Sequence, residues 1–368
     1  MSRYIAALDD SGGIEPLLDW NGNFIEGAHP ITSLSALIIK ESARAEFDRK
    51  WNRLRLKIQR QLGCEVLPPI HLRIMYGRTL PKRYRGRDNP YLNADFENIL
   101  GWIEDAYRLI WTFGRKTETL VWRTKSRTRR QLADMIVGVH ENPQYKAELQ
   151  FLKENSKSKR TKNMGLRYYK RTVSPLILIM LEMFLNISEI VSEVKGKVVN
   201  FIIDPFEDAH GVDTGEIIDV FRSTDGIDNI GTVTRADNAD EVPLVQAADL
   251  IGFMMFRKSL FEFRGEELDP LLDNIYRKYE FSLPDLAKVD RKIERKFKHV
   301  MERFQVVRYL LAKQQIDKVA PKFSEKYMID ADEAYRRMKQ ARSDTNAKGI
   351  LILKDQSVCS HLVKANPK

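Results

Sequence analysis

The sequence contains little cysteine and no long hydrophobic run. Its two cysteines, Cys64 and Cys359, lie far apart in the chain and have no metal-ligand partner nearby. This argues against a disulfide framework and a zinc finger, and it predicts a reducing, cytoplasmic location. The first ten residues, MSRYIAALDD, lack the apolar stretch of a signal peptide. The most apolar segment, 175 to 181, is followed by Glu182 and is shorter than a membrane span, so we expect a soluble protein without membrane contact.

Several common catalytic and binding motifs are also missing. The chain has no G-x-x-x-x-G-K-[ST] phosphate loop, no G-x-G-x-x-G fingerprint and no G-x-S-x-G nucleophile elbow. Cys359 and His361 are too close on one strand to face each other as a catalytic pair. No repeat appears at periods of 20 to 50 residues. These absences argue against nucleotide-loop enzymes, serine hydrolases and repeat proteins.

Positive charge is in excess. The 368 residues include 61 Lys and Arg against 51 Asp and Glu, which gives a net charge of +10 and a pI of about 9.3. A basic chain favours an acidic partner, and nucleic acid is the commonest one. No base-reading motif is present, so we expect recognition through backbone and shape.

One basic segment, from 76 to 91, combines cations with aromatic rings. Such a combination is typical of surfaces that contact phosphates and stack bases, although an exposed basic loop needs no partner. The predicted nucleic-acid-binding residues are Arg78, Lys82, Arg83, Arg85 and Arg87, with Tyr76, Tyr84 and Tyr91 interleaved.

The order of predicted elements favours an α/β domain with a mixed sheet. Periodicity, capping residues and turn signals give the boundaries. Strands are expected at 4 to 8, 32 to 40, 117 to 124, 197 to 204 and 229 to 237, the first two paired antiparallel. Helices are expected at 42 to 62, 95 to 113, 174 to 194 and 213 to 223, and from Pro243 onward.

The charge pattern predicts additions to this domain. Residues 1 to 262 form the predicted α/β domain, with a basic helical insertion at about 125 to 194. Residues 263 to 368 are predicted as a C-terminal helical extension that can dock a partner protein.

Acidic residues stand at the ends of apolar elements. Asp9 and Asp10 close the first predicted strand, and Asp204 closes the buried strand KVVNFIID. Asp249 is the only charged residue within LVQAADLIGFMMF. A lone carboxylate taken out of water costs several kcal/mol unless a cation or metal meets it. Oxygen ligands without cysteine select Mg²⁺ or Mn²⁺, which support phosphodiester hydrolysis.

Each acid also has a simpler interpretation. Asp9 and Asp10 are compatible with a surface turn, and Asp204 with a cap of the loop after its strand. Asp249 is compatible with a buried salt bridge, for example to Arg235. Gln246, one turn before Asp249, would orient a ligand or make a helix N-terminal hydrogen bond.

Four motifs together resemble a known family. They are LDDSGG, IHLRI, FIID and VQAADLIGF, and they are similar to the domain-of-unknown-function 3800 family of prokaryotic and phage proteins, within the ribonuclease H-like superfamily. The resemblance spans roughly residues 3 to 262. It implies a ribonuclease H-like mixed sheet flanked by helices, and a divalent-metal cluster in which Asp9, Asp204 and Asp249 match the family's acids.

The chain departs from the family at two points. The family's second acid, usually Glu, appears as Asp10. An acid often found two residues before the family's histidine is replaced by Pro69, ahead of His71. Asp10, Glu207 or Asp208 would have to complete the site.

The sequence therefore predicts a Mg²⁺- or Mn²⁺-dependent nuclease that hydrolyses DNA or RNA. Asp9, Asp204 and Asp249 are the expected catalytic metal ligands, assisted by Asp10. His71 is the candidate proton donor, because histidine exchanges protons near neutral pH, or else a core histidine. The alternatives are a catalytically silent nucleic-acid-binding or assembly subunit, and a toxin or anti-phage defence effector switched on by a partner.

Overall fold

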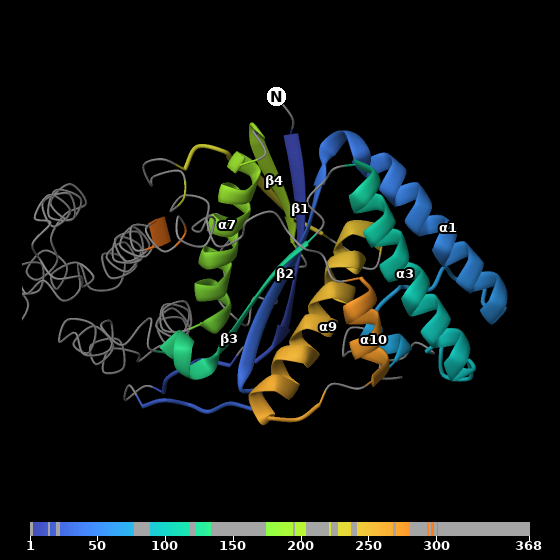
Figure 1. Ribbon diagram of the computed structural model, residues 1–368, viewed down its shortest axis with the longest axis horizontal. Helices are drawn as coiled ribbons and strands as arrows, with labels where there is room; N and C mark the ends of the chain where they lie inside the picture. The colour runs from blue at the N-terminus through green and yellow to red at the C-terminus, as the bar shows by residue number, and fades with distance from the viewer. Residues whose placement is uncertain are drawn as a thin grey trace, which may run out of the picture.

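A five-stranded mixed sheet organises the molecule (Figure 1). Its spatial order is β3-β2-β1-β4-β5. β2 is antiparallel to β1 and β3, whereas β4 is parallel to β1 and to β5, so β2 alone runs against the others. The strands are β1 (Arg3–Gly12), β2 (Ile31–Lys40), β3 (Trp122–Thr128), β4 (Val198–Ile203) and β5 (Ile230–Arg235).

This computed structural model describes part of the chain. The described residues are 3–13, 15–19, 23–76, 89–117, 122–133, 174–193, 196–203, 221, 227–236, 241–267, 270–279, 293, 296–297 and 300.

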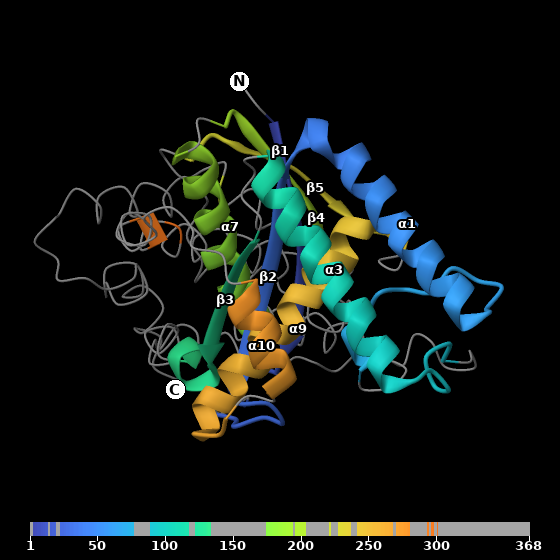
Figure 2. The ribbon, with the colours of Figure 1, turned by 45° about the vertical axis from the view of Figure 1, so that its right-hand side comes forward.

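Helices cover both faces of the sheet (Figures 1 and 2). α7 (Pro175–Glu193) lies on one face, and α9 (Pro243–Arg264) lies against β1 and β2 on the other. On the α9 side, α1 and α3 form an outer pair, and the short α2 and α10 complete the layer. Their bounds are α1 (Arg44–Leu62), preceded by the 3-10 turn η1 (Glu41–Ala43), α2 (Leu72–Met75), α3 (Phe96–Thr117) and α10 (Pro270–Lys278).

The central strand β1 shows how alternation builds two cores. Tyr4, Ala6 and Leu8 pack in the core under α7, and Ile5 and Ala7 pack in the core under α9. Successive strand residues point to opposite faces. Both faces of β1 are therefore lined mainly by apolar side chains from Tyr4 to Leu8, before Asp9 and Asp10.

α7 is buried almost all round. It is long and apolar enough to cross a membrane by length and composition, with a mean hydropathy of 1.7, but 94% of that window is buried inside the protein. Its apolar sequence is explained by contact with the sheet on one side and with Ile293, Phe297 and Val300 among its other neighbours.

Most predicted elements are confirmed. α1 ends at Gly63 in the left-handed conformation with φ of 65°, as its predicted cap requires, and Pro243 occupies the first turn of α9. The third strand starts at Trp122 rather than 117. Most of the helix expected at 213 to 223 lies outside the described residues. An α/β fold with a mixed sheet flanked by helices is thus established.

The segments predicted as additions contain parts of the core. The expected insertion, 125 to 194, includes most of β3 and all of α7, and these belong to the sheet and to its covering layer. α10 packs on α3 through Ile275 and Tyr279. Residues 134–173 and most of the chain beyond 279 lie outside the described residues.

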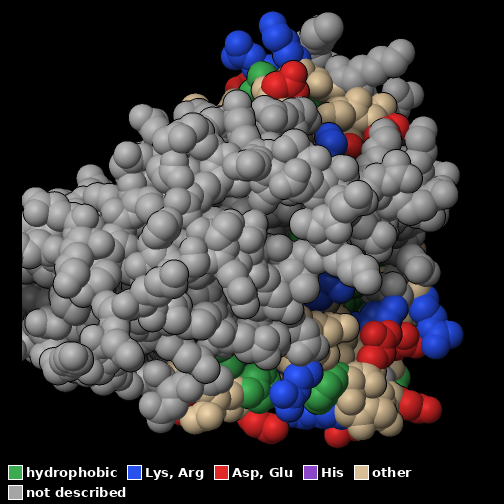
Figure 3. Space-filling model, turned by 90° about the vertical axis from the view of Figure 1, so that its left-hand side faces the viewer, with side chains coloured by type: hydrophobic (Ala, Val, Ile, Leu, Met, Phe, Trp, Pro, Cys, Tyr) green, Lys and Arg blue, Asp and Glu red, His purple; other side chains and the backbone are tan. Residues whose placement is uncertain are grey.

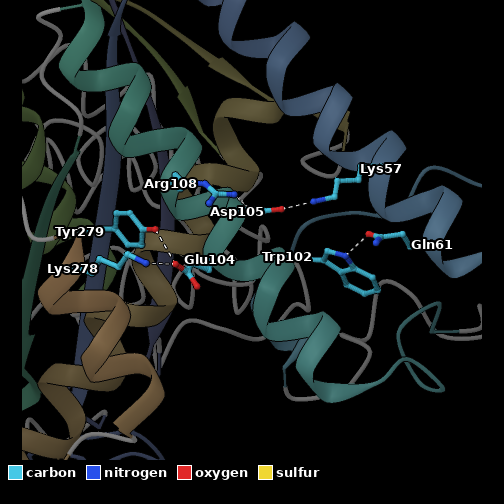
Figure 4. A network of polar contacts seen from close by, with 8 residues as sticks. All are labelled: Lys57, Gln61, Trp102, Glu104, Asp105, Arg108, Lys278 and Tyr279. Carbon is cyan, nitrogen blue, oxygen red and sulfur yellow. Dashed lines mark hydrogen bonds and ion pairs between the residues drawn. The ribbon is translucent and has the colours of Figure 1, made fainter.

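A polar network joins α1, α3 and α10 (Figure 4). Lys57 on α1 contacts Asp105 at 2.7 Å, and Trp102 Nε1 donates to Gln61 at 2.6 Å. Glu104 accepts hydrogen bonds from Lys278 and Tyr279 of α10. These contacts attach the outer helices to one another.

Candidate functional site

Asp249 and His71 meet between α9 and α2. Asp249 Oδ2 lies 3.2 Å from His71 Nδ1, and both side chains are mostly buried, 16% and 13% exposed. Within the described residues Asp249 pairs with His71, and no ion pair with Arg235 is seen there. The structure thus brings two of the predicted site residues together from positions 178 residues apart in the sequence.

The geometry leaves the Asp249 oxygen without a hydrogen bond. His71 is the N-cap of α2, and its Nδ1 accepts the Arg73 N–H at 3.3 Å. A ring nitrogen that accepts one hydrogen bond cannot at the same time donate to Asp249. Asp249 Oδ2 is buried and has no hydrogen-bond donor within the described part of the chain.

Gln246 holds the His71 segment against α9. Its Oε1 accepts from Trp51 Nε1 at 3.0 Å and from Ile70 N at 3.1 Å. The same segment is tied to α1 because Arg55 donates to the carbonyls of Pro68 and Leu67. Gln246 Oε1 therefore fixes the backbone next to His71.

Asp9 lies on the α9 side of β1. It is two residues after Ala7, so its side chain is on the same face of the strand. Asp9 is 6% exposed and lies opposite Ser35 of β2. A Cβ added to Gly252 of α9 would lie 3.4 Å from Ser35 Oγ and 3.5 Å from Ser11 Oγ. These are ordinary van der Waals distances, so α9 packs closely on the strands that carry Asp9 and Ser35.

Asp9 and Asp249 lie toward the same end of the β1–α9 contact. Gly252 contacts Ser11, and further along α9 Phe256 lies against Gly12, so helix and strand advance together. Asp249 is one turn before Gly252, and Asp9 is two residues before Ser11. Asp249 on α9 and Asp9 on β1 therefore both lie just before the point where Gly252 packs against Ser11.

The other two predicted acids stand differently. Asp10 is on the opposite face of β1, because it is two residues after Leu8, whose side chain packs on the α7 side. Its position does not support the expected metal role beside Asp9. Asp204, like Glu207 and Asp208, lies outside the described residues, but the residue before it, Ile203, pairs with Leu8, which precedes Asp9. Within the described ranges no group of three or more His, Cys, Asp or Glu has metal-binding geometry.

A cavity of about 430 Å³ opens beside the carboxyl ends of β4 and β5. Ligands of open α/β sheets bind at this end of parallel strands. Its wall combines Arg44, Arg235 and Thr234 with the apolar Ile202 and with Val242 at the start of α9. The cavity thus lies next to the last described residues before Asp204.

Tyr107 of α3 reaches the same helix. Its hydroxyl donates to the Leu250 carbonyl. Complete burial raises the pKa of Tyr107 well above its usual value, and the charge of Asp249 raises this pKa further. Tyr107 therefore stays a neutral donor and supports the α9 backbone next to Asp249.

The predicted nucleic-acid segment is only partly testable. Arg78, Lys82, Arg83, Arg85, Arg87 and Tyr84 lie outside the described residues. Tyr91, expected as a stacking ring, is fully buried and donates its hydroxyl to the Pro69 carbonyl at 2.9 Å. Tyr76 packs on Phe96 with ring centroids 5.5 Å apart. Tyr91 is thus a core residue and not a base-stacking platform.

Sequence reasoning missed a row of hydroxyls on the α9 face. Ser33 Oγ and Ser126 Oγ are 2.8 Å apart, as are Ser35 Oγ and Thr124 Oγ1. The signal was present, since small hydroxyl residues alternate with apolar ones in TSLSALIIK. This row makes the sheet surface next to Asp9 polar.

No family model matches the chain. No curated protein matches it either. The fold and the site geometry therefore define the class of protein: an α/β protein with a five-stranded mixed sheet and a buried carboxylate–imidazole pair beside its central strand.

Proposed function

We propose that this protein is a Mg²⁺- or Mn²⁺-dependent nuclease with a ribonuclease H-like fold that hydrolyses phosphodiester bonds of DNA or RNA. The observation that carries the proposal is the buried Asp249 Oδ2, which has no hydrogen-bond donor among the described residues. A buried, ionised oxygen needs a cation, and oxygen ligands suit hard divalent ions.

The strand arrangement supports the fold part of the proposal. The order β3-β2-β1-β4-β5, with only β2 reversed, agrees with what the family resemblance implies. The acids are proposed to come from the central strand, from the residue after its parallel neighbour β4, and from the helix that packs on both β1 and β2.

Each residue has a proposed role. Asp9 and Asp249 would hold the metal, with Asp204 as the third acid. When bound, the ion would activate a water molecule and neutralise charge on the phosphate during in-line displacement. His71, when protonated on both ring nitrogens, would donate its Nε2 proton to the leaving oxygen and become a neutral imidazole, while its Nδ1 side faces Asp249. Gln246 would keep His71 in position through Ile70.

Cleavage assays test the proposal. Purified protein is incubated with labelled DNA and RNA, with Mn²⁺ or with a chelator. We expect cleavage only with metal, and loss of at least about a hundredfold for Asp249→Asn, since a ligand and a charge are removed together. Asp273→Asn on α10, which removes a partly exposed carboxylate paired with Arg277, is the control and should cleave normally. Wild-type protein that cleaves neither substrate contradicts the proposal.

One observation favours the alternative of a catalytically silent nucleic-acid-binding or assembly subunit. Pro69 stands where the resembled family often has an acid, so a carboxylate that could complete the metal site is absent at this position. A thermal-shift titration with Mn²⁺ separates the two functions, because an ion that binds only the native state raises its apparent stability. A shift that disappears in Asp9→Asn supports the nuclease, and nucleic-acid binding without any shift supports the silent subunit.

A further inference from the structure

The exposed face of α1 carries basic side chains that the proposed active site does not use. Residues 49 to 61 contain six Lys and Arg and no Asp or Glu. At 100° per residue, Arg49, Arg53, Leu56 and Arg60 lie on one narrow stripe, and all four are exposed. We call these four residues the α1 stripe. It points away from the core, which α1 contacts through the opposite face bearing Phe47, Trp51 and Ile58.

The three arginines of the α1 stripe have no ion-pair partner within the described residues. Other basic side chains of α1 do have partners: Lys50 pairs with Glu46 and Lys57 with Asp105. On the face shown in Figure 3, the visible basic side chains also lie beside acidic ones. What sets the stripe apart is that three arginines without an ion pair in the described residues lie in line on one exposed helix face.

Repulsion between neighbouring basic side chains makes this row of arginines unusual for a helix face that contacts only solvent. Arg49 and Arg53 are four residues apart, and so are Arg53 and Lys57, so like charges face each other along the helix. Such pairs destabilise a helix, whereas alternating signs stabilise it. Favourable interaction with the helix dipole applies only to Arg60, in the last turn. A polyanion bound across the stripe would remove the repulsion.

The surface at the stripe is hollowed. A depression of about 410 Å³ is lined by Arg53, Leu56, Lys57, Arg60 and Gln61. Leu56, 42% exposed, gives it an apolar floor between cations, which suits the sugar of a nucleotide whose phosphates contact the arginines. Arg49 and Arg60 are about 16 Å apart along the helix, which matches about five phosphates of one strand of a duplex.

The stripe is linked to the site without being part of it. Trp51, on the inner face of α1, donates to Gln246, which lies one turn from Asp249. The stripe is on the far side of the same helix, about a helix diameter away. Nucleotides bound there would lie outside the proposed site, on its α1 side.

We propose that the α1 stripe binds the phosphate backbone of a nucleic acid at nucleotides flanking the cleaved bond. The inference rests on the nucleic-acid substrate of the proposed function and adds a binding surface to it. Because the contacts are to phosphates, they depend on salt and on length and not on base sequence.

Binding measured without metal tests this separately from cleavage. Fluorescence anisotropy is recorded in a chelator with labelled 6- and 30-nucleotide single strands and a 30-base-pair duplex. For Arg53→Ala/Arg60→Ala we expect affinity for the long ligands to fall about five- to eightfold per arginine at 0.1 M salt, and the slope of log K against log salt to fall by about 0.7 to 0.9 per arginine. Affinity for the 6-mer should change less.

The matched control is Arg264→Ala, which removes an exposed arginine without an ion pair in the described ranges, at the end of α9. It should leave affinity and slope unchanged, and circular dichroism checks that all variants fold. An unchanged salt slope in the folded double variant overturns the proposal. An equal loss of binding to labelled polyglutamate also overturns it, because it assigns the stripe to an acidic protein. If the wild-type protein does not cleave nucleic acid but the double variant shows the reduced salt slope, the proposed nuclease activity is wrong and the proposed binding role of the α1 stripe is supported.

Discussion

The two faces of the central sheet treat buried charge in opposite ways. On the α7 face, Glu182 and Glu189 are each only a few per cent exposed, and each meets a cation: Arg127 for Glu182 and Lys296 for Glu189. On the α9 face, the side chain paired with Asp249 is the imidazole of His71, and Asp249 Oδ2 has no hydrogen-bond donor among the described residues. Matched charges on the first face hold the fold together, and under the proposed function the Asp249 oxygen on the second face would bind the metal ion.

The largest stability effect should come from the matched face. Arg127→Met leaves the buried Glu182 carboxylate without the guanidinium that donates to both of its oxygens. Removing one partner of a buried pair costs about 3 kcal/mol or more. Urea denaturation should show this loss in the free energy of unfolding.

The double variant sharpens this prediction. Arg127→Met/Glu182→Leu removes both charges and should recover most of the lost stability, because well-packed apolar residues replace buried pairs at little cost. Asp249→Asn, by contrast, should change unfolding by less than about 1 kcal/mol, since it removes a charge that no strong partner stabilises. An Asp249→Asn loss as large as that of Arg127→Met contradicts the difference between the two faces.

The next effect should arise at Gln246. Gln246→Leu leaves the Trp51 and Ile70 N–H groups buried without their acceptor, at a cost of about 2 to 3 kcal/mol. The control is Gln61→Leu, which removes a similar hydrogen bond from Trp102 at an exposed glutamine and should cost less than about 1 kcal/mol. Equal losses in the two variants would mean that Gln246 does not hold the His71 segment through buried hydrogen bonds.

A smaller effect is expected where α9 approaches the hydroxyl row. A Cβ at Gly252 would make ordinary contacts at 3.4 and 3.5 Å with Ser35 and Ser11. Gly252→Ala should therefore keep or raise stability by up to about 1 kcal/mol, because alanine favours a helix interior. Gly252→Val should lower it by about 1 to 3 kcal/mol through overpacking. Thermal unfolding of the two variants gives the sign of each change.

Local patterns were sufficient for most of the secondary structure. The paired strands at the N-terminus follow from their apolar alternation, and α1 and α9 follow from Gly63 and Pro243 at their ends. The third strand was placed too early because its residues, RTKSRT after Trp122, are polar. Its pairing with β2 depends on Ser126 and Thr124 meeting hydroxyls of the neighbouring strand, which no local pattern contains.

The sequence singles out individual candidate residues but does not give their contacts. Asp249 stood out as a charge inside an apolar helix, and the structure brings it to His71. The pairing depends on Gln246 binding Ile70, which is a long-range contact between residues 176 positions apart. Asp9 and Asp10 looked equivalent in the sequence, and only the faces of β1 separate them.

The smallest predicted effect concerns pH and the contact between α3 and α10. The hydrogen bond from Lys278 lowers the pKa of Glu104, with a further lowering from Tyr279 (Figure 4). The folded state therefore binds fewer protons at Glu104 than the unfolded state, so this group stabilises the fold above the usual carboxyl pKa. That contribution is lost as the pH falls through the lowered value. Because the carboxylate is 39% exposed, solvent screening keeps the effect small.

Glu104→Gln should lose less stability than wild type between about pH 5 and pH 3 in urea denaturation. Glu97→Gln, at an exposed position of the same helix, should follow the wild-type curve, and a Glu104→Gln curve that also follows it would show that α10 is not held to α3 by this carboxylate.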